Sequence, residues 1–203
     1  MSDIESFEFA SEAASLAKRI VARYPEGRQQ SAVIPLLDLA QRECGGWLPT
    51  AAIEHVASCL GMPKIRVLEV ASFYTMFNLN PVGKNVVQLC RTTPCWLRGS
   101  DDLRKTAQEV TGCGLGETSN DGLFTVVEVE CLGACCNAPM VQINDDFYED
   151  LTSDSLRAVL EALKRGEKPK TGSQIDRTGS EPVGGLTTLT GGAAATAPIG
   201  GDD

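Results

Sequence analysis

The segment from Cys131 to Pro139 reads CLGACCNAP and places three cysteines within six positions of a chain that has eight in all. A second segment, CRTTPC at residues 90–95, separates two more cysteines by four residues. Thiols at this density act as metal ligands, as redox groups or as disulfide partners. The compartment of the protein and the way the two segments meet in the fold decide among these roles.

The composition of the chain argues against several classes of partner. Its 27 acidic and 18 basic residues give a net charge of −9, which disfavours nucleic-acid phosphates and anionic membrane surfaces. No apolar run has the length of a membrane-spanning helix, so we expect no membrane insertion. The acidic start, MSDIESFEFASE, lacks the basic and apolar parts of a secretory signal. We therefore expect a reducing compartment, where clustered cysteines bind metal or carry out redox chemistry more often than they form structural disulfides.

Residues 8–82 are predicted to form a helical domain. Apolar residues recur at helical spacing in four segments, 11–24, 28–43, 50–60 and 63–77. Ser11 is the expected N-cap of the first helix, and Pro35 either kinks the second or marks its first turn. Gly61 ends the third helix, and Pro63 occupies the first turn of the fourth.

Residues 83–165 change period and predict an α+β domain. The expected strands cover 84–90, 123–131 and 139–144, with a fourth short strand after the turn that begins DDFYED at 145–150. The expected helices cover 101–110 and 152–166, and Thr152 or Ser153 caps the second of them.

The C-terminal segment, residues 166–203, differs in composition from the rest of the chain. It holds nine glycines and no aromatic residue. Such a segment cannot bury enough apolar surface to offset the entropy that it loses on ordering. We therefore expect a disordered tail.

The two cysteine segments are each expected to begin at the end of a strand. Cys90 ends the first predicted strand and is followed by Cys95, and Cys131 ends the second and is followed by Cys135. Neighbouring strands lie about 4.8 Å apart. If these two strands are neighbours, we expect both loops to leave the sheet at the same end and the two thiol pairs to converge, which is the geometry of a four-thiolate metal site.

The spacing leaves two kinds of metal centre open. Four thiolates suit zinc or an iron–sulfur cluster. Structural zinc favours tight Cys-x2–4-Cys knuckles, whereas a binuclear cluster needs one pair of thiolates for each iron, which two separate loops provide. Small and hydroxyl residues in the loops, among them Thr92 and Gly133, leave donors free to reach sulfur. Spacing alone favours iron–sulfur over zinc only slightly.

One of the three clustered thiols has no partner in this scheme. Cys131 would be joined by either Cys135 or Cys136, because adjacent residues in a turn point in different directions. The spare thiol is expected to be a small buried apolar residue. The same expectation covers the isolated cysteines Cys44, Cys59 and Cys113. A thiol–disulfide enzyme that uses Cys135 and Cys136 as a vicinal pair is a further possibility, although a Cys-x-x-Cys motif is missing.

At CRTTPC and CLGACCNAPMVQIN the sequence resembles the E-subunit (24 kDa) family of proton-pumping NADH:quinone oxidoreductase, respiratory complex I. The resemblance extends through SFYTMF and covers roughly residues 8–165. It implies a thioredoxin-like ferredoxin domain that holds one [2Fe-2S] cluster behind an N-terminal helical domain. It carries the ligand roles to Cys90, Cys95, Cys131 and Cys135, and not to Cys136. Thioredoxin folds often have a cis-proline at the position of Pro139.

The resemblance also implies the function. The chain would be an electron-transfer subunit of an oxidoreductase and translocase, with no complete active site of its own. Its cluster would exchange an electron with FMN on the adjacent F subunit, which also binds NADH. Within the peripheral arm of the complex, it would lie on the cytoplasmic side of a bacterial inner membrane or on the matrix side of the mitochondrial one. Alternatives are a diaphorase subunit of an NAD-reducing hydrogenase or formate dehydrogenase, and a zinc-stapled structural subunit.

Three further features have simpler interpretations. The single histidine, His55, lies in a helical pattern and is expected at the surface or at a boundary. The glycines of TGCGLGE, at 111–117, lack the spacing of a dinucleotide-binding loop and predict a helix C-cap followed by a loop. In SFYTMF, at 72–77, a helix cannot hide four large apolar side chains against one side. We expect part of them, with Trp47, to form an interface patch.

Overall fold

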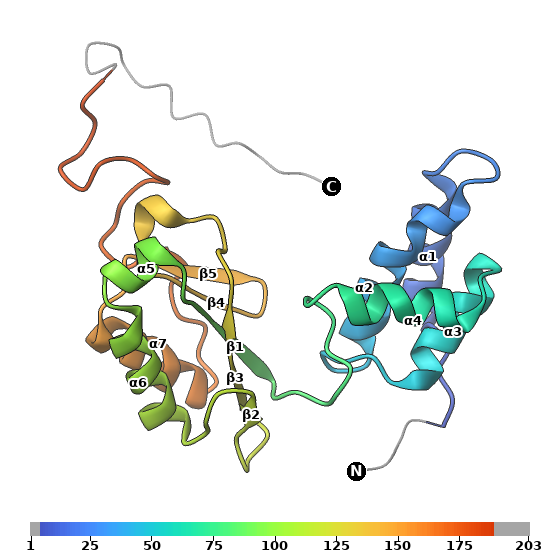
Figure 1. Ribbon diagram of the computed structural model, residues 1–203, viewed down its shortest axis with the longest axis horizontal. Coiled ribbons are helices and arrows are strands. Elements are labelled where there is room, and N and C mark those ends of the chain that lie inside the picture. The colour runs from blue at the N-terminus through green and yellow to red at the C-terminus, as the bar shows by residue number, and fades with distance from the viewer. Residues whose placement is uncertain (1–4, 189–203) are drawn as a thin grey trace. The chain divides into compact units, whose positions relative to one another are not determined.

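The structure is a computed structural model, and it describes residues 5–188. Its contacts separate two compact units (Figure 1). The first contains residues up to 88 together with 107–128, and the second contains 89–106 together with the residues from 129 onward. The sequence boundary expected between residues 82 and 83 stays a prediction.

Four α-helices occur in the first unit, as predicted. They are α1 (Ser11–Ala22), α2 (Val33–Glu43), α3 (Thr50–Leu60) and α4 (Lys64–Phe73), and a short 3-10 helix, η1 (Gln29–Ala32), precedes α2. Their buried faces form one core that includes Leu36, Leu37, Val56 and Val67. The left-handed backbone of Gly61, at φ 58°, ends α3 as expected, and Pro35 lies in the first turn of α2. None of the helices within residues 5–188 is long and apolar enough to cross a bilayer.

The predicted cap of α1 is wrong. Ser11 is already the first residue of the helix, and Ala10 occupies the N-cap position without a side-chain hydrogen bond. A distant carboxylate reaches this end instead, because the backbone N–H of Ala10 donates to Glu43 Oε2 at 3.2 Å. The cap was predicted from residues near Ser11, whereas Glu43 lies 33 positions away from Ala10 in the sequence.

The fourth helix is shorter than predicted, because it ends at Phe73 and not at Phe77. Gln41 on α2 holds the following segment out of helical conformation, since its side-chain amide donates to the Met76 carbonyl at 3.0 Å. The same side chain accepts from the backbone N–H of Asn78 at 2.7 Å. Phe77 therefore turns back into the core and is 5% exposed, whereas Phe73 is 76% exposed.

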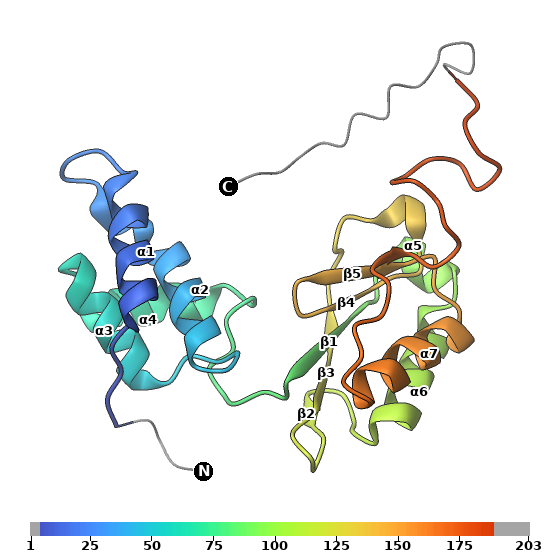
Figure 2. The same ribbon diagram turned by 180° about the vertical axis from the view of Figure 1, so that it is seen from behind.

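One six-stranded sheet has the order β2-β3-β1-β4-β5-β6. The strands are β1 (Asn85–Cys90), β2 (Glu117–Thr118), β3 (Phe124–Val129), β4 (Val141–Ile143), β5 (Asp146–Glu149) and β6 (Gly172–Ser173). The helices are α5 (Thr93–Leu97), α6 (Ser100–Thr111) and α7 (Ser153–Lys164), with a 3-10 turn η2 (Cys135–Asn137). Figures 1 and 2 show α6 and α7 side by side against the sheet. The four predicted strands and two predicted helices are present, and the short elements α5, β2, η2 and β6 were not predicted.

The strands β1 and β3 run parallel. Their register is the same at both ends, because Asn85 N–H donates to the Leu123 carbonyl at 2.9 Å and Arg91 N–H donates to the Val129 carbonyl at 3.3 Å. The two strands therefore end at one edge of the sheet. Beyond them, β4 and β5 form an antiparallel hairpin, and β6 pairs parallel to β5.

Thr152 caps α7, as one of the two expected residues. Its side chain accepts from the backbone N–H of Ser155, and the Ser155 hydroxyl in turn accepts from the backbone N–H of Thr152. The Ala138–Pro139 peptide bond is cis, which agrees with the prediction for Pro139.

The C-terminal segment is described as far as residue 188, and part of it folds onto the sheet as β6. Part of the segment predicted to be a disordered tail is therefore paired with the sheet. Composition indicated disorder, but strand pairing and a buried ion pair order residues 172–181. The expectation for residues 189–203 lies outside the described residues.

We predict that Gly83→Ala destabilises the protein. A Cβ at this buried position would lie 2.6 Å from the carbonyl carbon of Phe124 and would push the two backbones apart. Overpacking of this kind costs about 1–3 kcal/mol, which a urea unfolding curve measures directly. Gly184→Ala is the matched control, because nothing lies within 4 Å of the added atom. Equal unfolding midpoints for the two variants would contradict the close approach.

Candidate metal centre

The first pair of thiols lies at the end of β1. Cys90 is the last residue of the strand, and Cys95 lies in α5; they are 2% and 1% exposed. Thr92 occupies the N-cap position of α5, but its hydroxyl makes no capping bond. It lies instead 3.4 Å from Cys90 Sγ. The residue that begins the helix thus supplies a donor to the sulfur.

The second pair follows β3. Cys131 comes two residues after the strand ends, and the chain then turns through Gly133, whose φ of 90° suits glycine. This turn brings Cys135, the first residue of η2, to a sulfur–sulfur distance of 3.3 Å from Cys131. The Gly133 N–H donates to Cys131 Sγ at 3.4 Å. In contrast to the first pair, both thiols are exposed.

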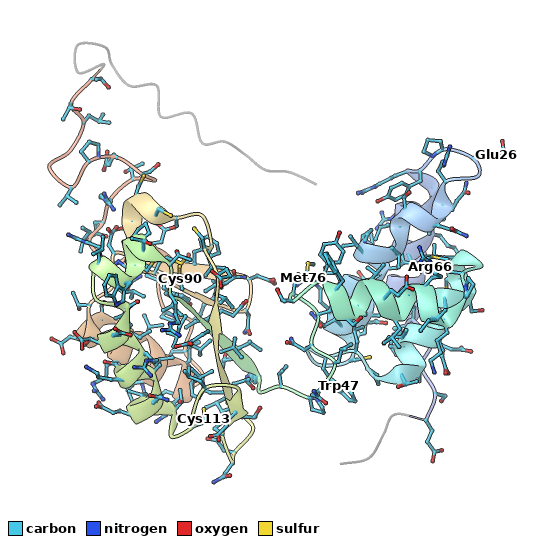
Figure 3. The ribbon with its side chains drawn as sticks, in the orientation of Figure 1. Glu26, Trp47, Arg66, Met76, Cys90 and Cys113 are labelled. Atoms are coloured by element: carbon cyan, nitrogen blue, oxygen red, sulfur yellow. The ribbon has the colours of Figure 1, made fainter. Side chains whose placement is uncertain are left out.

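The loops that carry the two pairs lie next to each other. The bond between the Arg91 N–H and the Val129 carbonyl joins the ends of β1 and β3, so both loops leave at the same edge. Cys90 and Cys95 pack with the buried residues Ala138 and Met140, and with Leu132 and Ala134 of the other loop. Figure 3 shows Cys90 at this edge of the sheet. The two loops are therefore neighbours, and the convergence of all four thiols on one metal site stays a prediction.

Within each pair, the pKa of one thiol is lowered and the pKa of the other is raised. Burial would raise the pKa of Cys90, but hydrogen bonds from the Thr92 hydroxyl and from the N–H groups of Thr92 and Leu132 outweigh it, and the pKa is lowered. Burial raises the pKa of Cys95 to about 12, and its thiol donates to Cys90.

The exposed pair shows the same division. The Gly133 N–H, followed by the Cys135 thiol, lowers the pKa of Cys131. Donation to the Cys131 sulfur, followed by burial, raises the pKa of Cys135. In each pair, one thiol thus gives up its proton more readily than the other, and a metal that binds both sulfurs displaces the protons that they carry.

The thiols are arranged as two pairs, one on each loop. Each pair has a hydrogen-bond donor already directed at one sulfur. Soft thiolate ligands held as separate pairs match a binuclear iron–sulfur cluster.

The remaining cysteines lie outside this group. Cys113 is buried, as expected, and its thiol donates to Thr111 Oγ1 at 3.3 Å. Cys44 is half-buried against the helical core. The expectation of burial is wrong for Cys59 and Cys136, which are exposed. Cys59 lies off the buried stripe of α3, and Cys136 lies in a three-residue turn that presents it to solvent.

Two other sequence features have the simple roles expected of them. His55 is half-buried and packs edge-on against the rings of Phe7 and Phe9, at centroid distances of 5.5 and 5.1 Å. Gly112, at φ 71°, follows the last residue of α6 and leads into a loop. Neither feature suggests a catalytic or nucleotide-binding site.

Comparison with known proteins identifies the type of domain. A family model described as thioredoxin-like [2Fe-2S] ferredoxin matches residues 17–164. The chain belongs to this family. Ferredoxins of this family carry an iron–sulfur cluster, which is the group that the paired thiols fit.

Two relatives match this chain over most of its length. The chain is 56% identical over 161 residues to the E subunit of NADH-quinone oxidoreductase from Rickettsia bellii (strain RML369-C), covering 79% of this chain and 96% of that protein. It is 51% identical over 183 residues to NADH dehydrogenase [ubiquinone] flavoprotein 2, mitochondrial, of Dictyostelium discoideum, covering 90% of this chain and 74% of that protein.

A solved structure is similar in fold. A crystal structure of NAD+-reducing [NiFe]-hydrogenase in the H2-reduced state matches with a TM-score of 0.57 and 19% identity. The match covers 66% of this chain and 22% of the hydrogenase chain, so the ferredoxin chain spans about a fifth of it. The likeness is one of fold.

We predict that an alkylating agent modifies Cys131 first and Cys95 last in the metal-free chain. The thiolate is the reacting form, and a lowered pKa keeps it populated at a pH where an ordinary thiol is protonated. Cys131 is also exposed, whereas Cys95 is buried. We expect rates that differ roughly tenfold or more, since one pKa unit alone is a factor of ten. Peptide mass spectrometry over a pH series measures both rates, and similar rates at neutral pH would contradict the assignment.

Proposed function

We propose that Cys90, Cys95, Cys131 and Cys135 hold one [2Fe-2S] cluster, and that the chain is the electron-transfer E subunit of an NADH:quinone oxidoreductase. The observation that carries this proposal is the parallel pairing of β1 and β3, which starts the two thiol-bearing loops at the same end of the sheet. The 56% identity to a protein named as the E subunit of NADH-quinone oxidoreductase, over 96% of its length, supports the assignment to that enzyme.

When bound, such a cluster accepts and returns one electron. The chain's own residues bind and orient it. Cys95 and Cys135 give up their protons on binding, which makes the affinity fall as the pH falls. The Thr92 hydroxyl and the Gly133 N–H donate to sulfur and offset part of the negative charge that four thiolates bring together. Ala138 and Met140 exclude water from the buried pair.

The electron partner in this proposal is the flavin of an F subunit that also binds NADH. One relative carries the name flavoprotein 2, which supports assembly with a flavin-containing module. The helix α5 presents Trp96 and Leu97 to solvent directly after Cys95. Exposed apolar side chains of this size are typical of a protein interface. The subunit would then belong to the peripheral arm, on the cytoplasmic or matrix side of the membrane.

Two alternatives share parts of this account. A diaphorase subunit of an NAD-reducing hydrogenase would use the same thiols, and the hydrogenase chain of similar fold favours it to that extent. A zinc-stapled structural subunit would use them without redox activity. The arrangement of the thiols as two pairs on separate loops favours the binuclear cluster over zinc, because such a cluster takes one pair for each iron.

We predict that Cys135→Ser removes most of the visible colour of the anaerobically purified chain, because the exposed pair loses a ligand. Cys136→Ser is the matched control, since Cys136 is the adjacent thiol and is equally exposed. The unchanged chain should contain equimolar iron and acid-labile sulfide and should become paramagnetic on reduction. A colourless chain with zinc would support the structural alternative, and opposite effects of the two substitutions would overturn the ligand assignment.

We also predict that the isolated chain self-associates and that Phe73→Ser weakens this association. Phe73, Tyr74 and Met76 are exposed, and Phe73 packs edge-on against Tyr74 at 5.1 Å between ring centroids. Figure 3 shows Met76 and the half-buried Trp47 projecting from the helical bundle at separate places. If Phe73 is buried where two chains meet, its replacement changes the association constant by roughly tenfold or more. Light scattering at high concentration measures it, and a monodisperse monomer of the unchanged chain would count against the patch.

A further inference from the structure

The segment from Gly172 to Glu181, here called the C-terminal strap, contacts the turn that carries Cys135. It begins as β6, which pairs with β5 through Tyr148–Gly172 and Glu149–Ser173. In Figures 1 and 2 its orange-red ribbon runs beside the short yellow turn of η2. These residues lie beyond residue 164, where the match to the family model ends. The strap is therefore an addition to the part of the domain that the family model covers.

The strap is fixed by a buried ion pair. Arg177 contacts both carboxylate oxygens of Asp150, through Nη2 to Oδ1 at 2.5 Å and Nε to Oδ2 at 3.1 Å. Their side chains are 8% and 5% exposed. The Ser173 hydroxyl donates to the same carboxylate at 2.7 Å. A guanidinium and a carboxylate that meet in this forked geometry hold each other in one orientation.

Arg177 joins this ion pair to η2. Its Nη2 also donates to the backbone carbonyl of Cys136 at 2.8 Å, and its Nη1 donates to the Glu181 carbonyl at 2.9 Å. A second link runs in the opposite direction, because the buried Asn137 side chain donates to the Gly179 carbonyl at 2.7 Å. Two of the three residues of η2 are thus bonded to the strap.

Besides the strap, η2 contacts α5, and the buried residue Ala138 follows it. The turn contains three residues, and the loop before it turns through Gly133. Its two thiols are exposed, so no apolar burial holds their side chains in place. The bond of Asn137 to Glu149 at 2.6 Å and the bond of the Asp150 N–H to the Asn137 carbonyl at 2.7 Å tie only the last residue of the turn to the domain.

We propose that the C-terminal strap holds η2, and with it Cys135, in the position for metal ligation, and that Arg177 is the positioning residue. The guanidinium makes this possible because its several donors reach a carboxylate and two carbonyls at once. A lysine at this position keeps the charge opposite Asp150 but cannot make all of these bonds. The effect on metal binding rests on the proposed function, in which Cys135 is a ligand. The claim that the strap holds η2 does not depend on that role.

Arg177→Lys in the full chain tests the proposal. We expect amide hydrogen exchange at residues 134–138 to speed up roughly tenfold or more, because a hydrogen bond from a charged donor contributes on that scale. Release of iron from the purified chain to a chelator should speed up as well, while thermal unfolding changes little. Arg177→Met removes the charge in addition and should increase both rates further.

Lys170→Gln is the matched control. Lys170 also pairs with a residue of the strap, Asp176, but both side chains are exposed, and an exposed ion pair contributes little to holding a segment in place. This variant should exchange hydrogen and release iron as the unchanged chain does. If Arg177→Lys and Lys170→Gln give equal exchange rates at 134–138, the strap does not position the turn.

The two proposals fail in different ways. If Cys135→Ser leaves the colour intact, the ligand assignment is wrong, yet faster exchange in Arg177→Lys would still support the strap. If Arg177→Lys alters exchange but not iron release, the strap holds η2 without affecting the metal, and the positioning role is wrong.

Discussion

The candidate site depends on the parallel pairing of β1 with β3. Parallel neighbours end at one edge of the sheet, and only then do the loops after Cys90 and Val129 start close together. The close approach of Gly83 to Phe124 lies near the start of the same two strands, so the pairing is constrained at both ends. A shift of one residue in register would turn each side chain of a strand to the opposite face and would move Cys90 away from its partners. The positions of the cysteines therefore depend on the register of the sheet.

The loops that follow these strands contain hydrogen-bond donors that stabilise negative charge on the sulfurs. Four thiolates in a small volume repel one another, and burial makes the charged form less favourable still. Hydrogen-bond donors near the sulfurs reduce this repulsion. The Thr92 hydroxyl lies beside Cys90 Sγ and does not cap α5. The left-handed backbone of Gly133 directs its N–H at Cys131. Before metal binds, the retained protons of Cys95 and Cys135 reduce the charge further.

The sequence predicted the features that depend on neighbouring residues. Helical spacing located the four N-terminal helices, glycine placed the end of α3 at Gly61, and alternating apolar residues located the main strands. Its errors arose where a residue distant in sequence intervenes, as Gln41 does when it ends α4 early. The strap was missed for the same reason, because a Gly-rich composition gives no sign of the buried pair of Arg177 with Asp150. Spacing likewise left Cys135 and Cys136 equivalent, and the 3.3 Å approach of Cys135 to Cys131 depends on the fold of the turn.

The two thiol pairs differ in their access to solvent. Cys90 and Cys95 are covered by protein, whereas Cys131 and Cys135 face outward. Oxidants such as peroxide would therefore damage the outer pair before the inner one. If the proposed cluster forms here, iron and sulfide would arrive from the exposed side of the site. A partner docked over that side would block their entry, so cofactor insertion would then precede assembly.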